Sequence, residues 1–317
     1  MSESRSNGAK LRELIESDEI LRAPGAPNPL AARALDMVGF DAIYMTGYGS
    51  SLTMGVPDAG LITMPEMVRN ANNVQERVSV PVVADADNGY GNATNVIRTV
   101  REYVKTGVGG IHIEDQTFPK RCGHVSGRQV VPKSEAVGKV RAAADVRDER
   151  DEEFVLIART DARGAVDGSL EDAIDRANAF CEAGADVAFV EGPTDVEELE
   201  AVAENVDAPL VYNYAGISPA VDASDLEELG FDLVIYPELG MKAAMMSVYR
   251  WGEAFEQRDA DALDDLDAAF EREVPFDMHE FAGFPQVVEW EEQYLPEEEA
   301  EKYDDTLGAN IDEMDNQ

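Results

Sequence analysis

The sequence predicts an α/β fold, a (β/α)8 barrel of the TIM type followed by a helical, acidic C-terminal extension. Two observations predict it. Short β-branched runs alternate with helical patterns along the chain, and the runs are mainly apolar without strict alternation, as in strands buried on both faces. The 317 residues can hold a barrel of about 250 residues and an extension. We expect one domain over 1–317, with the barrel at about 19–250 and the extension at about 251–317.

Eight runs fit the pattern of a buried parallel strand. They cover 19–25, 41–47, 81–87, 110–116, 154–161, 187–192, 210–213 and 233–238. An open, doubly wound sheet is the alternative. The segments 47–49 and 89–91, both Gly-Tyr-Gly, lack the G-x-G-x-x-G spacing, so no dinucleotide fingerprint supports that alternative.

The helices between these strands carry their own boundary signals. Capping-box patterns at 63–66 and 194–197 place helix starts at their threonines, and Ser169 is a third plausible N-cap. Gly184 and Gly230 precede the next predicted strands and should end helices. After residue 238 the pattern is helical and increasingly acidic.

The charge of the chain is extreme and spread along its whole length. It holds 65 acidic against 26 basic residues, a formal net charge of -39. Such a field opposes binding to nucleic acid and to acidic membrane surfaces. A diffuse acidic coat keeps a protein hydrated in very high salt, where self-repulsion is screened. We therefore expect a halophilic protein, and an ordinary acidic cytosolic protein is the alternative.

The two cysteines, Cys122 and Cys181, do not make a disulfide framework. No apolar run approaches the ~18 residues of a membrane-spanning helix, and the start of the sequence lacks the apolar stretch of a signal peptide. The sequence therefore predicts a soluble, cytoplasmic protein.

Carboxylates follow neighbouring predicted strands at the points where the strands end. Asp85 and Asp87 lie at the end of one strand and Glu114 at the end of the next. The carboxyl ends of barrel strands share one rim, so these side chains should converge. Oxygen ligands of this kind suit Mg²⁺, with Mn²⁺ possible, whereas zinc would need paired Cys or His ligands.

The segment 114–131, EDQTFPKRCGHVSGRQVV, follows the Glu114 strand and should form a loop over the same rim. Lys120, Arg121 and His124 surround Cys122 in the sequence, which predicts a lowered thiol pKa and a reactive thiolate or ready proton donor. A cationic loop facing a metal indicates a small anionic substrate. Cys181 lies on a helical apolar face and should be a buried hydrophobic residue, and His112 a hydrogen-bonded residue of the barrel interior.

Several motifs together resemble one known superfamily. PKRCGH, YMTGYG followed by GVPDAG, VVADADNGYGN, IHIEDQ and IARTDA are similar to the isocitrate lyase/phosphoenolpyruvate mutase superfamily, closest to methylisocitrate lyase-like and carboxyvinyl-carboxyphosphonate mutase-like members. The resemblance implies a Mg²⁺-dependent barrel and a homo-oligomer, usually a tetramer that exchanges the helix after the last strand. Members with the loop cysteine are carbon–carbon lyases.

The resemblance also implies roles for individual residues. Asp87 would bind the metal most directly, with Asp58, Asp85 and Glu114 reaching it partly through water. The implied substrate-binding residues are Thr46, Gly47 and Tyr48 for the keto-acid half, Arg159, Glu191, Asn213, Gly123 and His124 for the other half, and the loop cations Lys120 and Arg121. Tyr44 would lie near the reacting hydroxyl, Cys122 would act as general acid, and His124 would assist it.

The reaction implied is a retro-aldol cleavage of a 2-hydroxy tricarboxylate, and 2-methylisocitrate, giving pyruvate and succinate, is the predicted substrate. KRCGH resembles methylisocitrate lyases, whereas isocitrate lyases more often have two lysines before the cysteine. The alternatives are isocitrate cleavage, a 2-alkylmalate or dimethylmalate lyase, and oxaloacetate decarboxylation. A regulatory barrel that only binds a metal or keto acid is the non-enzyme alternative. A Schiff-base aldolase would need a lysine at a strand end, and no predicted strand ends in one.

Overall fold

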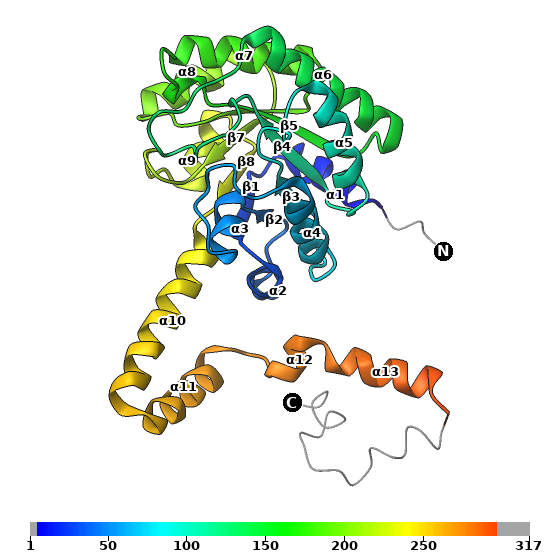
Figure 1. Ribbon diagram of the computed structural model, residues 1–317, viewed down its shortest axis with the longest axis vertical. Coiled ribbons are helices and arrows are strands. Elements are labelled where there is room, and N and C mark those ends of the chain that lie inside the picture. Colours follow the sequence, from blue (N-terminus) through cyan, green and yellow to red (C-terminus); the bar gives the residue numbers. More distant parts are fainter. Residues whose placement is uncertain (1–4, 297–317) are drawn as a thin grey trace. The chain divides into compact units, whose positions relative to one another are not determined.

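The computed structural model describes residues 5–296 and shows a closed barrel of eight parallel strands in sequence order (Figure 1). The strands are β1 Leu21–Ala26, β2 Ile43–Met45, β3 Val82–Asp85, β4 Gly110–Glu114, β5 Val155–Thr160, β6 Val187–Val190, β7 Leu210–Asn213 and β8 Leu233–Tyr236. Pairing of β1 with β8 closes the ring, with Leu21 opposite Leu233. The predicted barrel is confirmed, and the open doubly wound sheet is excluded.

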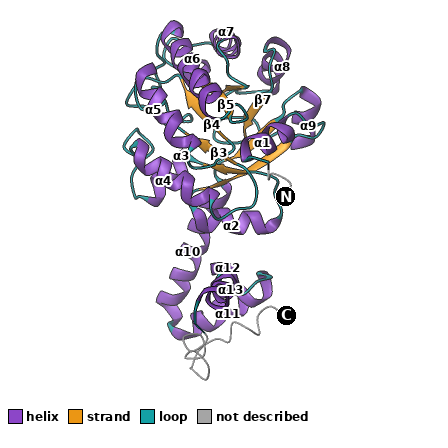
Figure 2. Cartoon of the chain, turned by 90° about the vertical axis from the view of Figure 1, so that its right-hand side faces the viewer, coloured by secondary structure: helices purple, strands orange, loops and turns teal. Residues whose placement is uncertain are grey.

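Helices surround the strands (Figure 2). The barrel helices are α1 Asn7–Ile15, α2 Pro29–Val38, α3 Gly47–Thr53, α4 Met64–Gln75, α5 Ala93–Val104, α6 Lys133–Arg150, α7 Leu170–Glu182, α8 Val196–Asn205 and α9 Ala223–Leu229, with a 3-10 turn, η1, at Ala162–Gly164. After β8 come α10 Leu239–Arg258, α11 Ala260–Glu273, α12 Met278–Ala282 and α13 Phe284–Tyr294.

The core has an inner and an outer part. Inward side chains such as Val83, Ile157 and Phe189 fill the barrel, and Leu11 and Ile15 of α1 belong to the same buried cluster. Other buried clusters pack the strands against α4 to α9. Apolar side chains therefore point both ways from each strand, which is why the strand sequences do not alternate.

Two of the three predicted helix starts are confirmed. Thr63 and Glu66 form the capping box of α4, and the Ser169 side chain caps α7. The N-cap predicted at Thr194 is wrong by one residue, because the Asp195 side chain accepts the Glu198 N–H instead. Gly230 ends α9 in the left-handed conformation that glycine tolerates (φ 97°).

The chain divides into two compact units, with the boundary after Met245. The first contains the barrel and the second the greater part of α10 together with α11 to α13. The predicted extension is helical over the residues described, and its last part, 297–317, lies outside them. Within the described range no helix is long and apolar enough to cross a membrane. The single-domain assignment stays a prediction.

Candidate active site

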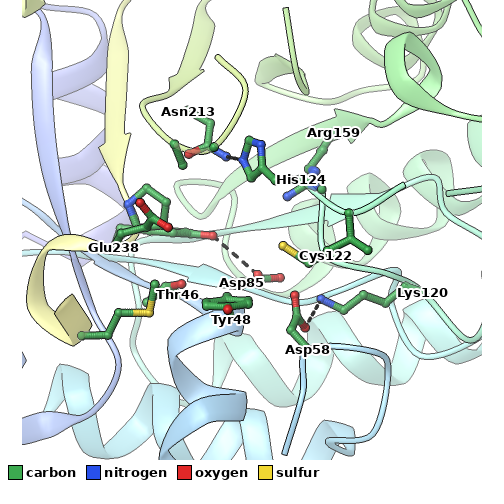
Figure 3. Close-up of a pocket in the computed structure, with 17 residues that line it drawn as sticks. Thr46, Tyr48, Asp58, Asp85, Lys120, Cys122, His124, Arg159, Asn213 and Glu238 are labelled. Atoms are coloured by element: carbon green, nitrogen blue, oxygen red, sulfur yellow. Dashed lines mark hydrogen bonds and ion pairs between the residues drawn. The ribbon is translucent and has the colours of Figure 1, made fainter. Parts of the chain in front are cut away.

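A cavity of about 260 Å³ opens at the carboxyl ends of the strands (Figure 3). The predicted residues that line it are Tyr44, Thr46, Tyr48, Asp58, Asp85, Lys120, Cys122, Gly123, His124, Arg159 and Asn213. The further lining residues are Val125, Ala215, Gly216, Pro237, Glu238 and Met241, which form a largely apolar wall. Sequence reasoning missed the apolar members of this wall, which come from the loop after β4 and from the segments after β7 and β8, because apolar side chains there give no chemical signal.

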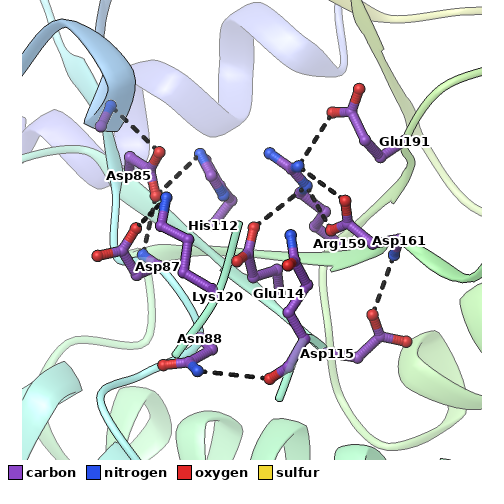
Figure 4. Close-up of polar contacts among 12 residues, drawn as sticks. Asp85, Asp87, Asn88, His112, Glu114, Asp115, Lys120, Arg159, Asp161 and Glu191 are labelled. Atoms are coloured by element: carbon purple, nitrogen blue, oxygen red, sulfur yellow. Dashed lines mark hydrogen bonds and ion pairs between the residues drawn. The ribbon is translucent and has the colours of Figure 1, made fainter. Parts of the chain in front are cut away.

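One ammonium group lies between two of the predicted metal ligands. Nζ of Lys120 is 2.6 Å from Oδ1 of Asp58 and 2.6 Å from Oδ1 of Asp87 (Figures 3 and 4). All three side chains are almost fully buried. Burial opposes the charge of Lys120, but Asp87 and the neighbouring carboxylates outweigh it and hold the lysine pKa well above its usual value. Lys120 therefore remains charged, and its ammonium group is paired with Asp58 and Asp87 before any substrate binds.

Asp85 is fixed by backbone N–H groups. Its Oδ2 accepts a hydrogen bond from the Gly47 N–H at 3.1 Å, and its Oδ1 accepts one from the Asp87 N–H at 2.8 Å. A side chain at Gly47 would have its Cβ 2.3 Å from that Oδ2, so this position at the start of α3 must be glycine. Thr46 caps the same helix through the Gly49 N–H. The predicted Thr46–Gly47 segment thus meets the carboxylate cluster directly.

Burial disfavours ionisation of two carboxyl groups of the acidic cluster, Asp87 and Glu114. Burial raises the pKa of Asp87 to about 6 despite Lys120, and burial raises that of Glu114 well above its usual value. Oε1 of Glu114 is buried and, within residues 5–296, has no hydrogen-bond partner. An orphaned carboxylate oxygen beside Asp85 and Asp87 fits a hard divalent cation. No three acidic, His or Cys side chains in the described part are gathered at metal-binding distance, since Lys120 engages Asp58 and Asp87.

Tyr44 and His112 form a buried pair under the cavity. Oη of Tyr44 lies 2.9 Å from Nε2 of His112 and 3.5 Å from Oδ2 of Asp85. Burial, then the Asp85 charge, raises the pKa of Tyr44 well above its usual value, and burial lowers the pKa of His112. Both groups are therefore neutral, and the predicted interior position of His112 is confirmed.

Arg159, at the end of β5, contacts three carboxylates (Figure 4). Its Nε donates to Oδ2 of Asp161 at 2.9 Å and its Nη2 donates to Oδ1 at 3.0 Å. Glu114 lies 3.5 Å and Glu191 lies 3.4 Å from its nitrogens. The guanidinium also lies over the ring of Phe189. These contacts orient Arg159 at the cavity wall before any ligand binds.

His124, Asn213 and Glu191 meet beside Arg159. Nδ2 of Asn213 is 3.2 Å from Nε2 of His124 and donates to Glu191 Oε2 at 3.1 Å. Oδ1 of Asn213 is buried without a hydrogen-bond partner among the described residues. The structure therefore brings together the residues predicted for the second half of the substrate, with one acceptor oxygen still open.

The thiol of Cys122 points into the cavity from the loop after β4 (Figure 3). The Cys122 N–H donates to the carbonyl of Asp58 at 3.2 Å. Burial raises the pKa of the thiol above its usual value, so the predicted lowering is wrong. Arg159 and Lys120 lower the thiol pKa by less than burial raises it, and Lys120 is itself paired with Asp58 and Asp87. A protonated thiol is the form that can act as a proton donor, so that part of the prediction remains.

Arg121 does not line the cavity, contrary to the role predicted for it. It is exposed, and its guanidinium donates to the carbonyl of Ser126. Sequence reasoning missed two buried cations behind the site, Arg128, which contacts Asp161, and Arg176, which contacts Asp115. In the sequence, Arg128 is an arginine in a loop with two glycines and Arg176 is an arginine in an amphipathic helix. Neither pattern indicates a buried ion pair.

Residues 11–255 match the protein family described as phosphoenolpyruvate phosphomutase. The chain belongs to that family. Its solved relatives include 2,3-dimethylmalate lyase, described as a PEP mutase/isocitrate lyase superfamily member, with a TM-score of 0.86 at 32% identity over 96% of this chain and all of that one. The predicted superfamily is thus confirmed.

Relatives of the phosphoenolpyruvate phosphomutase family with named activities are mostly lyases. The chain is 41% identical to 2,3-dimethylmalate lyase of Eubacterium barkeri over 91% of this chain and 98% of that protein. It is 40% identical to 2-methylisocitrate lyase of Aeropyrum pernix, over 75% and 76% of the two chains, and 35% identical to isocitrate lyase of Haloferax volcanii, over 91% and 87%. A phosphonopyruvate hydrolase solved with oxalate and Mg²⁺ has a TM-score of 0.81 at 29% identity, over 92% and 100%. The predicted enzyme class, a lyase, is confirmed.

Proposed function

We propose that the chain is a Mg²⁺-dependent carbon–carbon lyase that cleaves an alkyl-substituted 2-hydroxy dicarboxylate or tricarboxylate. The observation that carries the proposal is the placement of a protonated thiol, Cys122, in the same cavity as the carboxylate cluster and Arg159. A lyase of this kind needs a proton donor for the departing carbanion and an anion-binding group that stabilises the charge of that same half of the substrate.

The metal would be held by Asp85, Asp87 and Glu114, with Asp58 contributing through water. The burial of these carboxyl groups, which raises the pKa of Asp87 and Glu114, and the open Oε1 of Glu114 support this assignment. When bound, Mg²⁺ lowers the pKa of a chelated 2-hydroxy group and neutralises the keto acid that forms. Mn²⁺ has the same ligand preference and could replace it.

The side chains of the cavity would then share the work of the cleavage. Tyr44, a neutral phenol, would take the proton of the substrate hydroxyl while it passes its own proton to Nε2 of the neutral His112, 2.9 Å away. The bond between the hydroxyl-bearing carbon and its neighbour breaks, and the electron pair stays on the departing carbon. Cys122 delivers its S–H proton to that carbon, which gives a keto acid and a carboxylic acid. Arg159, His124 and Asn213 bind the carboxylates of the departing half, and the buried setting strengthens each contact.

The substrate that the cavity supports best is a dialkyl-substituted malate such as 2,3-dimethylmalate. Each cation at the cavity is already paired, Lys120 with two carboxylates and Arg159 with three. The wall of Val125, Ala215 and Met241 offers alkyl groups a surface but offers a third carboxylate no donor. The dimethylmalate lyase of Eubacterium barkeri is also matched over 98% of its length.

The substrate predicted from the sequence, 2-methylisocitrate, is the second candidate. The loop motif KRCGH favours it, and its methyl group would also use the apolar wall. One methyl group in an apolar pocket is worth only about 1–3 kcal/mol of discrimination. Cross-activity between the two substrates is therefore expected, and a single positive assay does not decide between them.

The deciding experiment compares kcat/KM for 2,3-dimethylmalate, 2-methylisocitrate, isocitrate and oxaloacetate in one high-salt buffer with Mg²⁺. We expect the highest value for 2,3-dimethylmalate. A higher value for 2-methylisocitrate moves the assignment to the second candidate. Faster release of glyoxylate from isocitrate makes the protein an isocitrate lyase, and release of pyruvate and CO2 from oxaloacetate alone makes it a decarboxylase. Release of no keto acid from any of them favours the regulatory barrel, and trapping of an adduct by borohydride would indicate an aldolase.

We also propose that the protein acts as a homo-oligomer whose contacts involve α10. Met246, Val248 and Tyr249 on this helix are 68%, 75% and 70% exposed, and a second copy of the chain would cover them. Sedimentation equilibrium in high salt should give a mass above that of one chain. Tyr249→Asp should lower this mass, and Glu256→Gln, on the same helix, should not. A monomeric wild type contradicts the proposal.

A further inference from the structure

Arg128 is a buried cation that belongs to the same loop as Cys122 but does not line the cavity. It is 4% exposed. Its Nη1 donates to Oδ1 of Asp161 at 3.1 Å, and Asp161 is fully buried. Burying a guanidinium is costly unless it is paired. The position of Arg128 therefore indicates a specific role for its contact with Asp161.

Asp161 joins Arg128 to the cavity. The same Oδ1 that accepts from Arg128 also accepts from Nη2 of Arg159, and Oδ2 accepts from Nε of Arg159. The Asp161 N–H donates to Asp115 at 2.9 Å, which fixes the backbone (Figure 4). Burial alone would raise the pKa of Asp161, but the charges of Arg159 and Arg128 outweigh burial and lower this pKa. One ionised carboxylate thus lies between two guanidinium groups.

The space around Arg128 is shaped to receive it. A Cβ added to Gly164 would lie 1.7 Å from Nη2 of Arg128, so any side chain there would displace the guanidinium. The carbonyl of Arg128 accepts the Val166 N–H at 3.0 Å. The Arg128 side chain and backbone together bind the loop to the segment that follows β5.

The loop also contacts Arg159 directly, at the residue next to the thiol. A Cβ added to Gly123 would lie 2.3 Å from Nη2 of Arg159. Arg159 is thus held between Gly123 on one side and Asp161 on the other, and Arg128 completes the link from Asp161 back to the loop. These contacts run from the loop to Arg159, on to Asp161 and back to the loop through Arg128. They connect the loop that carries the thiol with the guanidinium that would bind an anion.

We propose that Arg128 is a positioning residue that, through Asp161, fixes the Arg159 guanidinium and holds the Cys122 loop against it. Its influence on turnover rests on the proposed lyase function. Its influence on the position of the loop does not, and can be measured without turnover.

The test compares Arg128→Met with Arg163→Met. Methionine keeps most of the apolar stem and removes the charge. Arg163 lies in η1, beside Asp161 in sequence, and pairs with Glu198 at 2.7 Å, so its loss removes a neighbouring ion pair that does not touch the loop. Misplacing a catalytic group by about 1 Å can cost about 10²-fold. We expect kcat to fall by about that factor and KM to rise in Arg128→Met, with neither changed in Arg163→Met.

Alkylation of Cys122 by iodoacetamide, quantified by peptide mapping with Cys181 as internal reference, supplies the second readout. Oxalate with Mg²⁺ is the probe ligand. We expect oxalate to protect Cys122 in the wild type, and we expect faster alkylation of Cys122 and loss of this protection in Arg128→Met. Arg128→Lys, which keeps the charge, should recover part of both effects and serves if Arg128→Met does not fold.

Wild-type alkylation and protection in Arg128→Met would overturn the proposal. Equal losses in Arg163→Met would overturn it too, because they would indicate general loosening of the barrel. If wild-type protein cleaves no candidate substrate, the proposed function fails, but the alkylation rates still decide whether Arg128 positions the loop.

Discussion

The two cysteines differ in what surrounds their sulfur atoms, and this difference predicts opposite effects of removing them. Cys122 lines the cavity, whereas Cys181 packs against the buried cluster between α7, α8 and the strands. We expect Cys122→Ala to lose about 10²–10⁴-fold in kcat, as for removal of a general acid, with the melting temperature unchanged. Cys181→Ala should keep its activity and lose stability through a small cavity. Retained turnover in Cys122→Ala would exclude the thiol as proton donor.

The pH dependence of cleavage should report the same thiol. The proton donor works only in its protonated form, so the rate falls as pH rises through the thiol pKa. Because burial raises the pKa of Cys122, this fall should lie above the range of an ordinary thiol. The measurement is kcat/KM against pH at fixed salt, with a substrate that does not titrate there. A fall at or below the pKa of free cysteine would contradict the buried setting of Cys122.

Asp87 and Asp58 both contact Lys120, but their loss should have different consequences. Asp87 would bind the metal directly and Asp58 through water, and a direct ligand contributes more. We therefore expect Asp87→Ala to be inactive at every Mg²⁺ concentration and Asp58→Ala to be partly rescued by excess Mg²⁺. EDTA should abolish wild-type activity. An unchanged rate after chelation would make the carboxylate cluster structural.

The sequence could predict residues at strand ends but not the partners of residues in loops. Asp85, Glu114, Arg159 and Asn213 end strands, and a barrel places all such ends on one rim, so their convergence followed from the strand pattern. Lys120 is different. Its partner Asp58 lies in a distant loop, and no local pattern announces that contact. The prediction of the thiol pKa is wrong for another reason: burial of Cys122 outweighs the nearby cations, and the sequence of a loop does not show how deeply its side chains are buried.

At the scale of an element, the loop between β4 and α6 depends on the absence of a side chain at Gly123. Its Cβ would meet Nη2 of Arg159 at 2.3 Å and Cγ of Glu191 at 3.0 Å. Gly123→Ala should therefore move the loop, and a loss of about 10²-fold in kcat is expected from such a displacement. The melting temperature should hardly change.

Gly138 in α6 provides the matched control for Gly123. An added Cβ there meets nothing within 4 Å, so Gly138→Ala should keep full activity. It should also stabilise the protein by roughly 0.5–1 kcal/mol, because alanine loses less backbone entropy in a helix. Denaturant unfolding and steady-state kinetics of the two variants test both expectations. Wild-type kinetics in Gly123→Ala would show that the loop tolerates the added methyl group.

A helix boundary can be predicted from the sequence when a single residue near it has the properties that the boundary requires. Gly230 is predictable because α9 ends in the left-handed conformation, which glycine adopts readily. Thr194 was misassigned because Thr194 and Asp195 both have side chains that can cap. Which of these two adjacent residues becomes the N-cap depends on where the backbone turns into the helix, and tertiary packing determines that point.

For the whole molecule, the net charge of -39 dominates the expected behaviour. The Debye length is about 3 Å at 1 M salt and about 30 Å at 0.01 M. In molar salt each carboxylate is therefore screened from all but its nearest neighbours, whereas in dilute buffer the acidic coat repels itself across much of the barrel. The buried clusters of the barrel must then oppose a repulsion that grows with every dilution step.

We therefore expect the melting temperature to fall steeply as KCl is diluted from molar to millimolar concentration, with dissociation or unfolding at the low end. Glycerol at matched osmolality, which does not screen charge, should not replace KCl. NaCl at equal ionic strength should. If glycerol restores the melting temperature, preferential exclusion rather than screening stabilises the protein, and a melting temperature that stays flat across the dilution series would show that the acidic coat costs the fold little.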